Sequence, residues 1–264
     1  MLATPPVVIV FWRALLAALV LGSALWVWRP STTPRLRHLV FFAGSGAVLA
    51  IHWLTFFQSI QVSTVAVGLL SFSSFPLFVT LLEPVVFHER LRTFDLATCL
   101  LVVVGLTLVA PNFDLSQRLT QGVAWGTLSG LTFAVLALLN RKYVRGLSPL
   151  AIGAGQNAVA AMLLLPFIGA GAWRLSTREL ILLLALGLLC TACAHVLFVR
   201  GLATVRAQVA SVLTGLEPVY GILLAWLFLR EAPPFRTLLG GLLILGATIL
   251  TTWVRPRNPI PVND

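Results

Sequence analysis

Long apolar runs, separated by short breaks, make up almost the whole of this chain of 264 residues. A helix needs roughly 17 to 25 mainly apolar residues to cross the hydrocarbon core of a bilayer. Nine runs fall in this range, and we expect each to be a spanning helix: Pro5–Trp28, His38–Ile60, Thr64–Phe87, Phe94–Ala110, Gln121–Asn140, Leu150–Ala172, Leu180–Val199, Gln208–Leu229 and Thr237–Val254. Strand-like alternation over ten-residue stretches is absent from the sequence. The pattern predicts an all-α polytopic membrane protein.

Composition excludes most soluble classes of protein. Hydrophobic residues make up 59% of the chain and charged residues 10%, whereas soluble domains carry about 25% charged residues. So few charges could not cover a water-exposed surface, which excludes a soluble enzyme, a disordered tail and a nucleic-acid-binding module.

The basic residues predict the orientation in the membrane. The net charge is +10, and of 18 Lys and Arg residues twelve fall in the breaks on one side, five on the other, and Arg13 inside an apolar run. Lys and Arg accumulate on the cytoplasmic side of membrane proteins. We therefore expect the C-terminus in the cytoplasm and Met1 outside.

The chain resembles itself at an offset of 141–143 residues. Six pairs match: Pro6 with Pro149, His52 with His195, Pro76 with Pro218, Glu89 with Glu231, Phe94 with Phe235, and Gly105 with Gly246. By the charge count the matched helices run in opposite directions, which predicts the inverted-topology repeat of secondary transporters. We expect a first repeat over residues 1–112, a second over 119–256, and a cytoplasmic tail over 257–264.

The two repeats differ by one helix. The second has five predicted spans and the first has four, so Gln121–Asn140 has no counterpart. Its counterpart would lie upstream of Met1. We therefore expect that this chain lacks the first helix of a ten-helix design.

A motif of proline, a long apolar run and glutamate occurs twice, at Pro76–Glu89 and at Leu216–Glu231. With this motif and its two repeats, the chain resembles the EamA-type permeases of the drug/metabolite transporter superfamily. Trp53, followed by Phe57 and Ile60, is similar to the aromatic-rich third helix of that family. The resemblance covers the chain apart from the missing helix. It implies transport of small metabolites, among them amino acids, nucleotide sugars and amphipathic amines.

Ionisable residues inside the apolar runs are candidates for substrate binding or ion coupling, because a charge in a bilayer costs about 2.5–3.5 kcal/mol. Glu217 precedes Pro218 near the middle of its predicted helix; it binds a substrate ammonium, carries a coupling proton, or pairs with Arg13. Arg13 either clamps a substrate carboxylate or extends to the outer face. His52 and His195 either relay protons or donate hydrogen bonds to neighbouring helices.

Polar and aromatic residues at related positions extend this set. Gln156 and Asn157 take the place of Arg13 in the second repeat, which favours a cavity there. Trp53 and the phenylalanines that follow it either form a wall for an apolar substrate or pack the bundle.

Two prolines are candidate hinges. Pro76 and Pro218 each remove a backbone hydrogen bond, and we expect them to kink their helices. Ser74, just before Pro76, lines a cavity or satisfies freed carbonyls, and Thr214 belongs to a small, polar stripe beside Glu217.

For other notable residues we expect structural roles. Glu83 lies near the end of its span and is expected at the membrane interface, and Glu231 is expected to pair with Arg230. Close helix packing is expected at Gly122, Gly126 and Gly130. Burial as small hydrophobic side chains, rather than a redox or metal site, is expected for Cys99, Cys190 and Cys193.

No nucleophile elbow, zinc-binding motif or nucleotide-binding loop is present in the sequence. We therefore expect no enzyme, no metal and no cofactor. The sequence favours a secondary transporter, an exporter by preference, of small amphipathic metabolites in a bacterial plasma (inner) membrane, working by alternating access. Its expected partners are a small-molecule substrate and the lipid bilayer, with a second copy of the chain as a candidate and no nucleic acid. The alternatives are a non-transporting membrane scaffold or partner subunit and, less favoured, an intramembrane enzyme.

Overall fold

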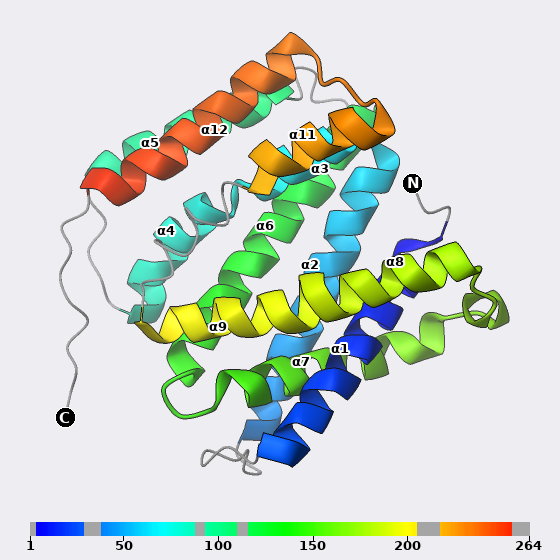
Figure 1. Ribbon diagram of the computed structural model, residues 1–264. Coiled ribbons are helices and arrows are strands. Elements are labelled where there is room, and N and C mark those ends of the chain that lie inside the picture. Colours follow the sequence, from blue (N-terminus) through cyan, green and yellow to red (C-terminus); the bar gives the residue numbers. More distant parts are fainter. Residues whose placement is uncertain (1–3, 29–37, 88–92, 110–115, 205–216, 255–264) are drawn as a thin grey trace. The chain divides into compact units, whose positions relative to one another are not determined.

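The computed structural model of the protein describes residues 4–28, 38–87, 93–109, 116–204 and 217–254. All secondary structure in these ranges is helical (Figure 1). The elements are α1 (Pro6–Trp28), α2 (Leu39–Val62), α3 (Val65–Phe72), α4 (Phe75–Phe87), α5 (Thr93–Val109), α6 (Arg118–Tyr143), α7 (Pro149–Leu164), η2 (Leu165–Phe167), η3 (Ala170–Trp173), α8 (Thr177–Gly187), η4 (Leu188–Cys193), α9 (Ala194–Thr204), α11 (Glu217–Leu229) and α12 (Phe235–Val254).

Within the part of the chain that the structure describes, six helical stretches are long and apolar enough to cross a membrane: Pro6–Trp28, Leu39–Val62, Val65–Phe87, Arg118–Tyr143, Pro149–Phe167 and Thr177–Ala203. Three shorter apolar helices in the described ranges are Ala97–Val109, Glu217–Leu229 and Phe235–Ala247. The expectation of an all-helical, multi-pass membrane protein is confirmed. The count of nine spans stays a prediction.

The predicted span Thr64–Phe87 is two helices, α3 and α4, separated at Ser73 and Ser74. The Ser73 hydroxyl donates to the carbonyl of Leu69 at 2.9 Å, and the Ser74 hydroxyl donates to that of Ser71 at 2.7 Å. Pro76 lies in the first turn of α4, where a missing N–H removes no helical bond. The break therefore falls just before Pro76, and Ser74 satisfies a carbonyl there.

The predicted span Leu180–Val199 contains a π-helical segment, η4, between α8 and α9. The N–H of Ala194 donates to the carbonyl of Leu189, five residues earlier. One extra residue per turn rotates the following helix by about 100°. Within the segment Thr191 is buried, whereas Cys190 and Cys193 are exposed. The expectation that these two cysteines are buried is wrong.

The predicted span Leu150–Ala172 ends early as an α-helix. α7 stops at Leu164, and the 3₁₀ turns η2 and η3 follow. Pro166 lies in η2, and a proline disfavours α-helical backbone at the residue before it. Ser148 caps the other end, because its side chain accepts from the N–H of Ala151 at 3.1 Å.

Two compact units make up the chain. Unit 1 comprises Met1–Leu54 and Leu139–Ala203, and unit 2 comprises Thr55–Leu138 and Thr204–Asp264. Each unit takes segments from both halves of the sequence. Helices far apart in the sequence therefore pack together within each unit.

In unit 1, α1 packs along α7 and contacts α8 and η4 (Figure 1). Ala17, Leu21, Ala154 and Ala192 form one buried cluster of mostly small side chains. A second cluster comprises Phe41, Phe42, Val144, Leu147, Ile152 and Val199. Small side chains let the helix backbones approach closely, which is how helices associate in lipid.

In unit 2, α5 packs along α12 and α11 packs against α3 (Figure 1). A Cβ on Gly105 would lie 2.6 Å from Ile244 Cγ1 and 2.8 Å from the carbonyl oxygen of Gly240, so glycine is needed for this approach. Glycines of α6 serve in the same way. A Cβ on Gly126 would lie 2.6 Å from Ser71 Cβ, and one on Gly130 would lie 2.9 Å from the carbonyl oxygen of Phe72.

A hydrogen bond joins the end of α11 to the start of α3 within unit 2. Arg230 has a positive φ of 57°, and its N–H donates to the carbonyl of Trp226 at 3.1 Å, which is the αL type of helix end. The Glu231 carboxylate then accepts from the N–H of Val65 at 3.1 Å. Its observed partner is thus a helix N-terminus, where a negative charge is favoured, rather than the Arg230 side chain that the sequence suggested.

Candidate functional site

Buried polar side chains gather in unit 1, on six different elements. They are Arg13 on α1, His52 on α2, Asn140 on α6, Gln156 and Asn157 on α7, Thr191 on η4 and His195 on α9, and each is at most 8% exposed. Polar groups in a membrane-embedded bundle normally face protein or a water-filled path and mark function. This set is the candidate site.

Arg13 is fixed on two sides. Its Nε donates to Thr191 Oγ1 at 3.0 Å, and its guanidinium carbon lies 3.9 Å from the centroid of the Trp53 ring. A desolvated cation–π contact of this kind contributes up to about 2 kcal/mol. With 7% of its surface exposed, Arg13 points into the protein and does not extend to the outer face.

A chain of hydrogen bonds joins three helices. His195 Nε2 and Gln156 Oε1 are 2.9 Å apart, and Gln156 Nε2 donates to Asn140 Oδ1 at 2.6 Å. An amide oxygen can only accept, so His195 donates from Nε2 to Gln156. Gln156 therefore links α9 to the end of α6 through both halves of its amide.

Two atoms of this set have no hydrogen-bond partner in the structure. They are Asn140 Nδ2, a donor, and Asn157 Oδ1, an acceptor, and both side chains are completely buried. Asn157 uses its other amide atom to donate to the carbonyl of Gly153 at 2.8 Å. An unpaired buried polar atom costs about 1–3 kcal/mol, so these atoms suit a polar ligand.

The cation and the amide chain belong to one cluster. The helix α1 that carries Arg13 packs along α7, which carries Gln156, and contacts η4, which leads into α9 and His195. Gly153 permits the close approach, since a Cβ there would lie 3.1 Å from Leu21 of α1 and 3.5 Å from His195 Cδ2.

The sequence candidates divide between the two units. Arg13, His52, Trp53, Gln156, Asn157 and His195 all lie in unit 1 and are buried. In unit 2, Glu217 is half-buried in the first turn of α11, beside a buried Pro218. Thr214 and Glu89 lie outside the described residues.

Thr191 and Asn140 are functional candidates that sequence reasoning missed. Asn140 is the last residue of an apolar run, next to Arg141, and was assigned to a helix end. Thr191 lies between two cysteines in the sequence, and in the structure it is buried within the π segment. A polar residue deep in a predicted span was the available signal for Thr191.

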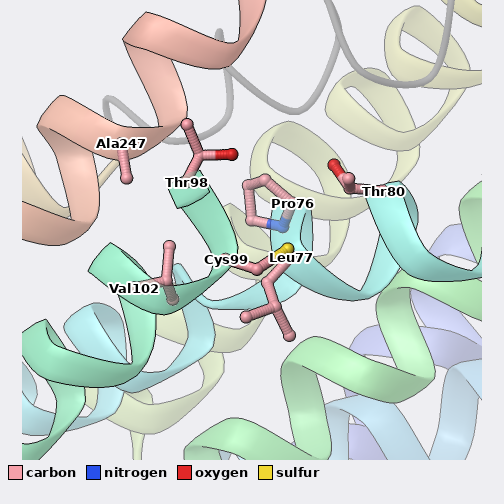
Figure 2. A pocket seen from close by; sticks show the side chains of 7 residues that line it. All are labelled: Pro76, Leu77, Thr80, Thr98, Cys99, Val102 and Ala247. Carbon is pink, nitrogen blue, oxygen red and sulfur yellow. The ribbon is translucent and has the colours of Figure 1, made fainter. Parts of the chain in front are cut away.

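A small cavity in unit 2 lies where the sequence predicts a hinge (Figure 2). The volume of this cavity that the centre of a water molecule can reach is about 10 Å³. That is room for roughly one water molecule. Its lining residues are Pro76, Leu77, Thr80, Thr98, Cys99, Val102 and Ala247, and Figure 2 shows them on neighbouring helices. The space is too small for a metabolite.

Two further expectations concern unit 2. Glu83 is only 1% exposed, so it is buried among the helices of unit 2; its expected place at the membrane interface stays a prediction. Gly122, Gly126 and Gly130 provide close packing, as expected, and their neighbours are residues of this chain. Among the phenylalanines, Phe72 and Phe75 are stacked, and Phe56 and Phe133 contact this pair edge to face, which is a packing role. Among the described residues, no group of three His, Cys, Asp or Glu could hold a metal.

Comparison with known proteins identifies the family. A model of the EamA-like transporter family matches residues 1–110 and 120–253. The chain belongs to the EamA-like transporter family.

Relatives of known sequence agree with this assignment. The chain is 26% identical over 256 residues to the uncharacterized transporter YxxF of Bacillus subtilis, covering 94% of this chain and 81% of that one. It is 28% identical over 205 residues to an uncharacterized transporter of Archaeoglobus fulgidus, covering 75% and 71%. A solved structure titled only as a crystal structure of a protein shares the fold, with a TM-score of 0.69, 19% identity, and coverage of 95% and 88%. This EamA-family protein is therefore a multi-pass membrane protein of a transporter family.

Proposed function

We propose that this EamA-family protein is a secondary transporter that exports small metabolites such as amino acids across a bacterial plasma membrane, with its C-terminus in the cytoplasm. The observation that carries the proposal is the buried cluster of Arg13, Asn140, Gln156, Asn157 and His195 in unit 1. It offers a cation, hydrogen-bond donors and hydrogen-bond acceptors inside an apolar bundle, which are the groups that an amphipathic metabolite needs.

Alternating access is the mechanism we infer. The helices that correspond in the sequence repeat, α1 with α7 and α5 with α12, pack along each other within their units. The family model also matches two consecutive stretches of similar length. Both observations support an inverted repeat, in which paired helices rock around a central substrate.

Breaks in the helices supply places for movement. The α3–α4 break lies beside Pro76, and the π segment interrupts α8–α9. Helices bend at such points because one or more backbone bonds are already lost. We infer that these segments carry the opening and closing movements, whereas α1 and α7 move as a pair.

Transport in proteoliposomes tests the proposal. Uptake of a labelled amino-acid panel is measured with and without a pH gradient for the wild type, Arg13→Gln and Glu217→Gln. Arg178→Gln, which removes an exposed arginine, is the matched control. We expect uptake by the wild type and by Arg178→Gln, and its loss in Arg13→Gln.

Glu217→Gln separates two roles. If uptake by Glu217→Gln persists but no longer depends on the pH gradient, Glu217 carries the coupling proton. If uptake and its dependence on the gradient are unchanged, Glu217 has only a structural role. If the well-folded wild type takes up no member of the panel under any gradient, the amino-acid proposal is wrong, and a non-transporting membrane protein becomes the better interpretation.

A further inference from the structure

Three basic side chains are exposed at one end of unit 1. They are Lys142 in the last turn of α6, Arg145 in the turn that follows, and Arg200 near the end of α9. Their neighbours Val144 and Val199 belong to one buried cluster, which places the α6–α7 turn beside the end of α9. The three cations therefore lie on one surface, which we call the basic end of unit 1.

No carboxylate in the described part of unit 1 neutralises the basic end. The one acidic residue in that part is Glu179, which accepts from the Thr4 hydroxyl at 2.8 Å and from the Ser176 hydroxyl at 2.7 Å. Glu179 and Arg200 lie near opposite ends of one helical stretch, Thr177–Ala203, so about 30 Å separates them. The three cations make no hydrogen bond or ion pair with a described residue.

The basic end lies where membrane-crossing stretches begin and end. Lys142 is in the last turn of Arg118–Tyr143, Arg145 is in the connection after it, and Arg200 is in the last turn of Thr177–Ala203. At the end of a spanning helix the hydrocarbon gives way to the polar headgroups, and Lys and Arg side chains at such ends reach the interface. The basic end is therefore at the level of the lipid headgroups.

Exposed apolar side chains continue this surface toward the hydrocarbon. On α9, Leu197 is 61% exposed and lies three residues before Arg200, so the two share a face of the helix, one turn apart. At the start of α2, Val40 is 82% exposed and precedes Phe41, whose ring stacks on that of Tyr143 with 4.1 Å between the centroids. A cation at headgroup level with apolar side chains one turn deeper matches the two parts of a phospholipid.

We propose that the basic end of unit 1 binds the headgroup phosphate of an anionic phospholipid, whose acyl chains lie along the exposed face of α9. Guanidinium groups bind phosphate oxygens in a forked manner, and Arg145 and Arg200 supply two such groups from different elements. A zwitterionic headgroup carries its own cation beside the phosphate and should bind more weakly. The site goes beyond the proposed transport and does not depend on it.

Lipid binding to purified protein in a neutral detergent tests the proposal. The probes are dioleoylphosphatidylglycerol, dioleoylphosphatidylcholine with the same acyl chains, and glycerol 3-phosphate, which has the charged group without the chains. The apparent Kd of each follows from the dose dependence of the unfolding temperature. The variant is the double substitution Arg145→Gln and Arg200→Gln. The matched control is Arg174→Gln with Arg178→Gln, which removes two exposed arginines before and within the first turn of α8.

We expect phosphatidylglycerol to bind the wild type more tightly than either of the other probes. The double variant at the basic end should raise the Kd for phosphatidylglycerol about 25-fold, since each cation beside an anionic lipid contributes about fivefold. The control, with the same net charge, should stay within about twofold of the wild type, because its charges are more than a screening length away. Without lipid, both double variants should unfold near the wild-type temperature, since all four side chains are exposed.

Three results would overturn the inference. Equal binding of phosphatidylglycerol and phosphatidylcholine would show that the acyl chains alone are recognised. An equal rise of the Kd in the two double variants would show that net charge attracts the lipid, and not the basic end. Glycerol 3-phosphate that binds as tightly as phosphatidylglycerol would show that the site takes a soluble anion and not a lipid.

Discussion

Replacing Gln156 with leucine removes the centre of the hydrogen-bond chain in unit 1. Leucine has a similar size but no polar atoms, so the packing of α7 is nearly kept. Two bonds disappear, the 2.9 Å bond to His195 and the 2.6 Å bond to Asn140. Because Asn140 Nδ2 already has no partner in the structure, the whole Asn140 amide becomes unpaired.

The size of the effect follows from the atoms left behind. His195 Nε2 and Asn140 Oδ1 each lose a partner in a fully buried setting, at about 1–3 kcal/mol per group in soluble proteins. Measured values between membrane helices are lower, about 0.6 kcal/mol on average and up to 1.7. We therefore expect a loss of about 2 kcal/mol in the free energy of unfolding, or roughly 4–8 °C in the midpoint of thermal unfolding.

The assay is thermal unfolding of purified protein in detergent, with Asn140→Leu as the second mutation of a double-mutant cycle. Asn140→Leu should destabilise the wild type, since it removes the partner of Gln156. In the Gln156→Leu background it should stabilise, since it removes an amide with no remaining partner. Gln117→Leu, at an exposed position just before α6, should change the midpoint little.

The sign reversal is the decisive result. If Gln156→Leu unfolds at the wild-type temperature, or if Asn140→Leu destabilises both backgrounds equally, the chain of hydrogen bonds does not hold these helices together.

Three further predictions use the same unfolding assay. Gly130→Ala should lower the free energy of unfolding by about 1–2 kcal/mol, because the new Cβ would lie 2.9 Å from a backbone oxygen at the α3–α4 break. Gly44→Ala, with nothing within 4 Å of the new Cβ, should raise the free energy of unfolding by about 0.5–1 kcal/mol. Equal effects of the two substitutions would contradict the close packing at Gly130. Arg230→Gly should stabilise by about 1 kcal/mol, because the φ of 57° is unfavourable for a residue with a Cβ, and Arg230→Ala should bring no such gain. Ser176→Ala should destabilise by about 1 kcal/mol, since Ser176 and Glu179 form a capping box at the start of α8; an unchanged midpoint would show that this helix end needs no cap.

The pattern of apolar residues predicted much of the secondary structure, because the free energy that makes a segment helical in lipid depends on that segment alone. A run of about 20 apolar residues must be helical in lipid, since every backbone N–H and C=O needs a partner. Helices such as α1, α2, α5 and α6 therefore begin and end near their predicted bounds, whereas α7 stops before its predicted end. The breaks within the spans were harder to predict. Two serines separate α3 from α4, and an extra residue forms the π segment. At the π segment the apolar pattern of the sequence continues without interruption, so it gives no indication of the break.

The sequence predicted most residues of the candidate site, but it did not predict which of them contact one another. Arg13, Gln156, Asn157 and His195 were singled out because polar residues are expensive inside apolar runs. Nothing in their spacing told whether Arg13 faces lipid or protein, since a helix carries side chains on all sides. The answer came from Thr191 and Trp53, which lie 178 and 40 positions away along the chain and bind it from other helices.

By itself, the sequence determined that this protein is a bundle of membrane helices, and it determined which residues are too polar to face lipid. Both follow from the cost of placing backbone and side-chain polar groups in hydrocarbon, which each segment meets on its own. The tertiary structure alone decided that α1 packs on α7 and α5 on α12, that Thr191 is buried within the π segment, and that Gln156 joins His195 to Asn140. Such pairings depend on the fit of small side chains and on hydrogen bonds between distant segments, and many arrangements of equally apolar helices would satisfy the lipid equally well.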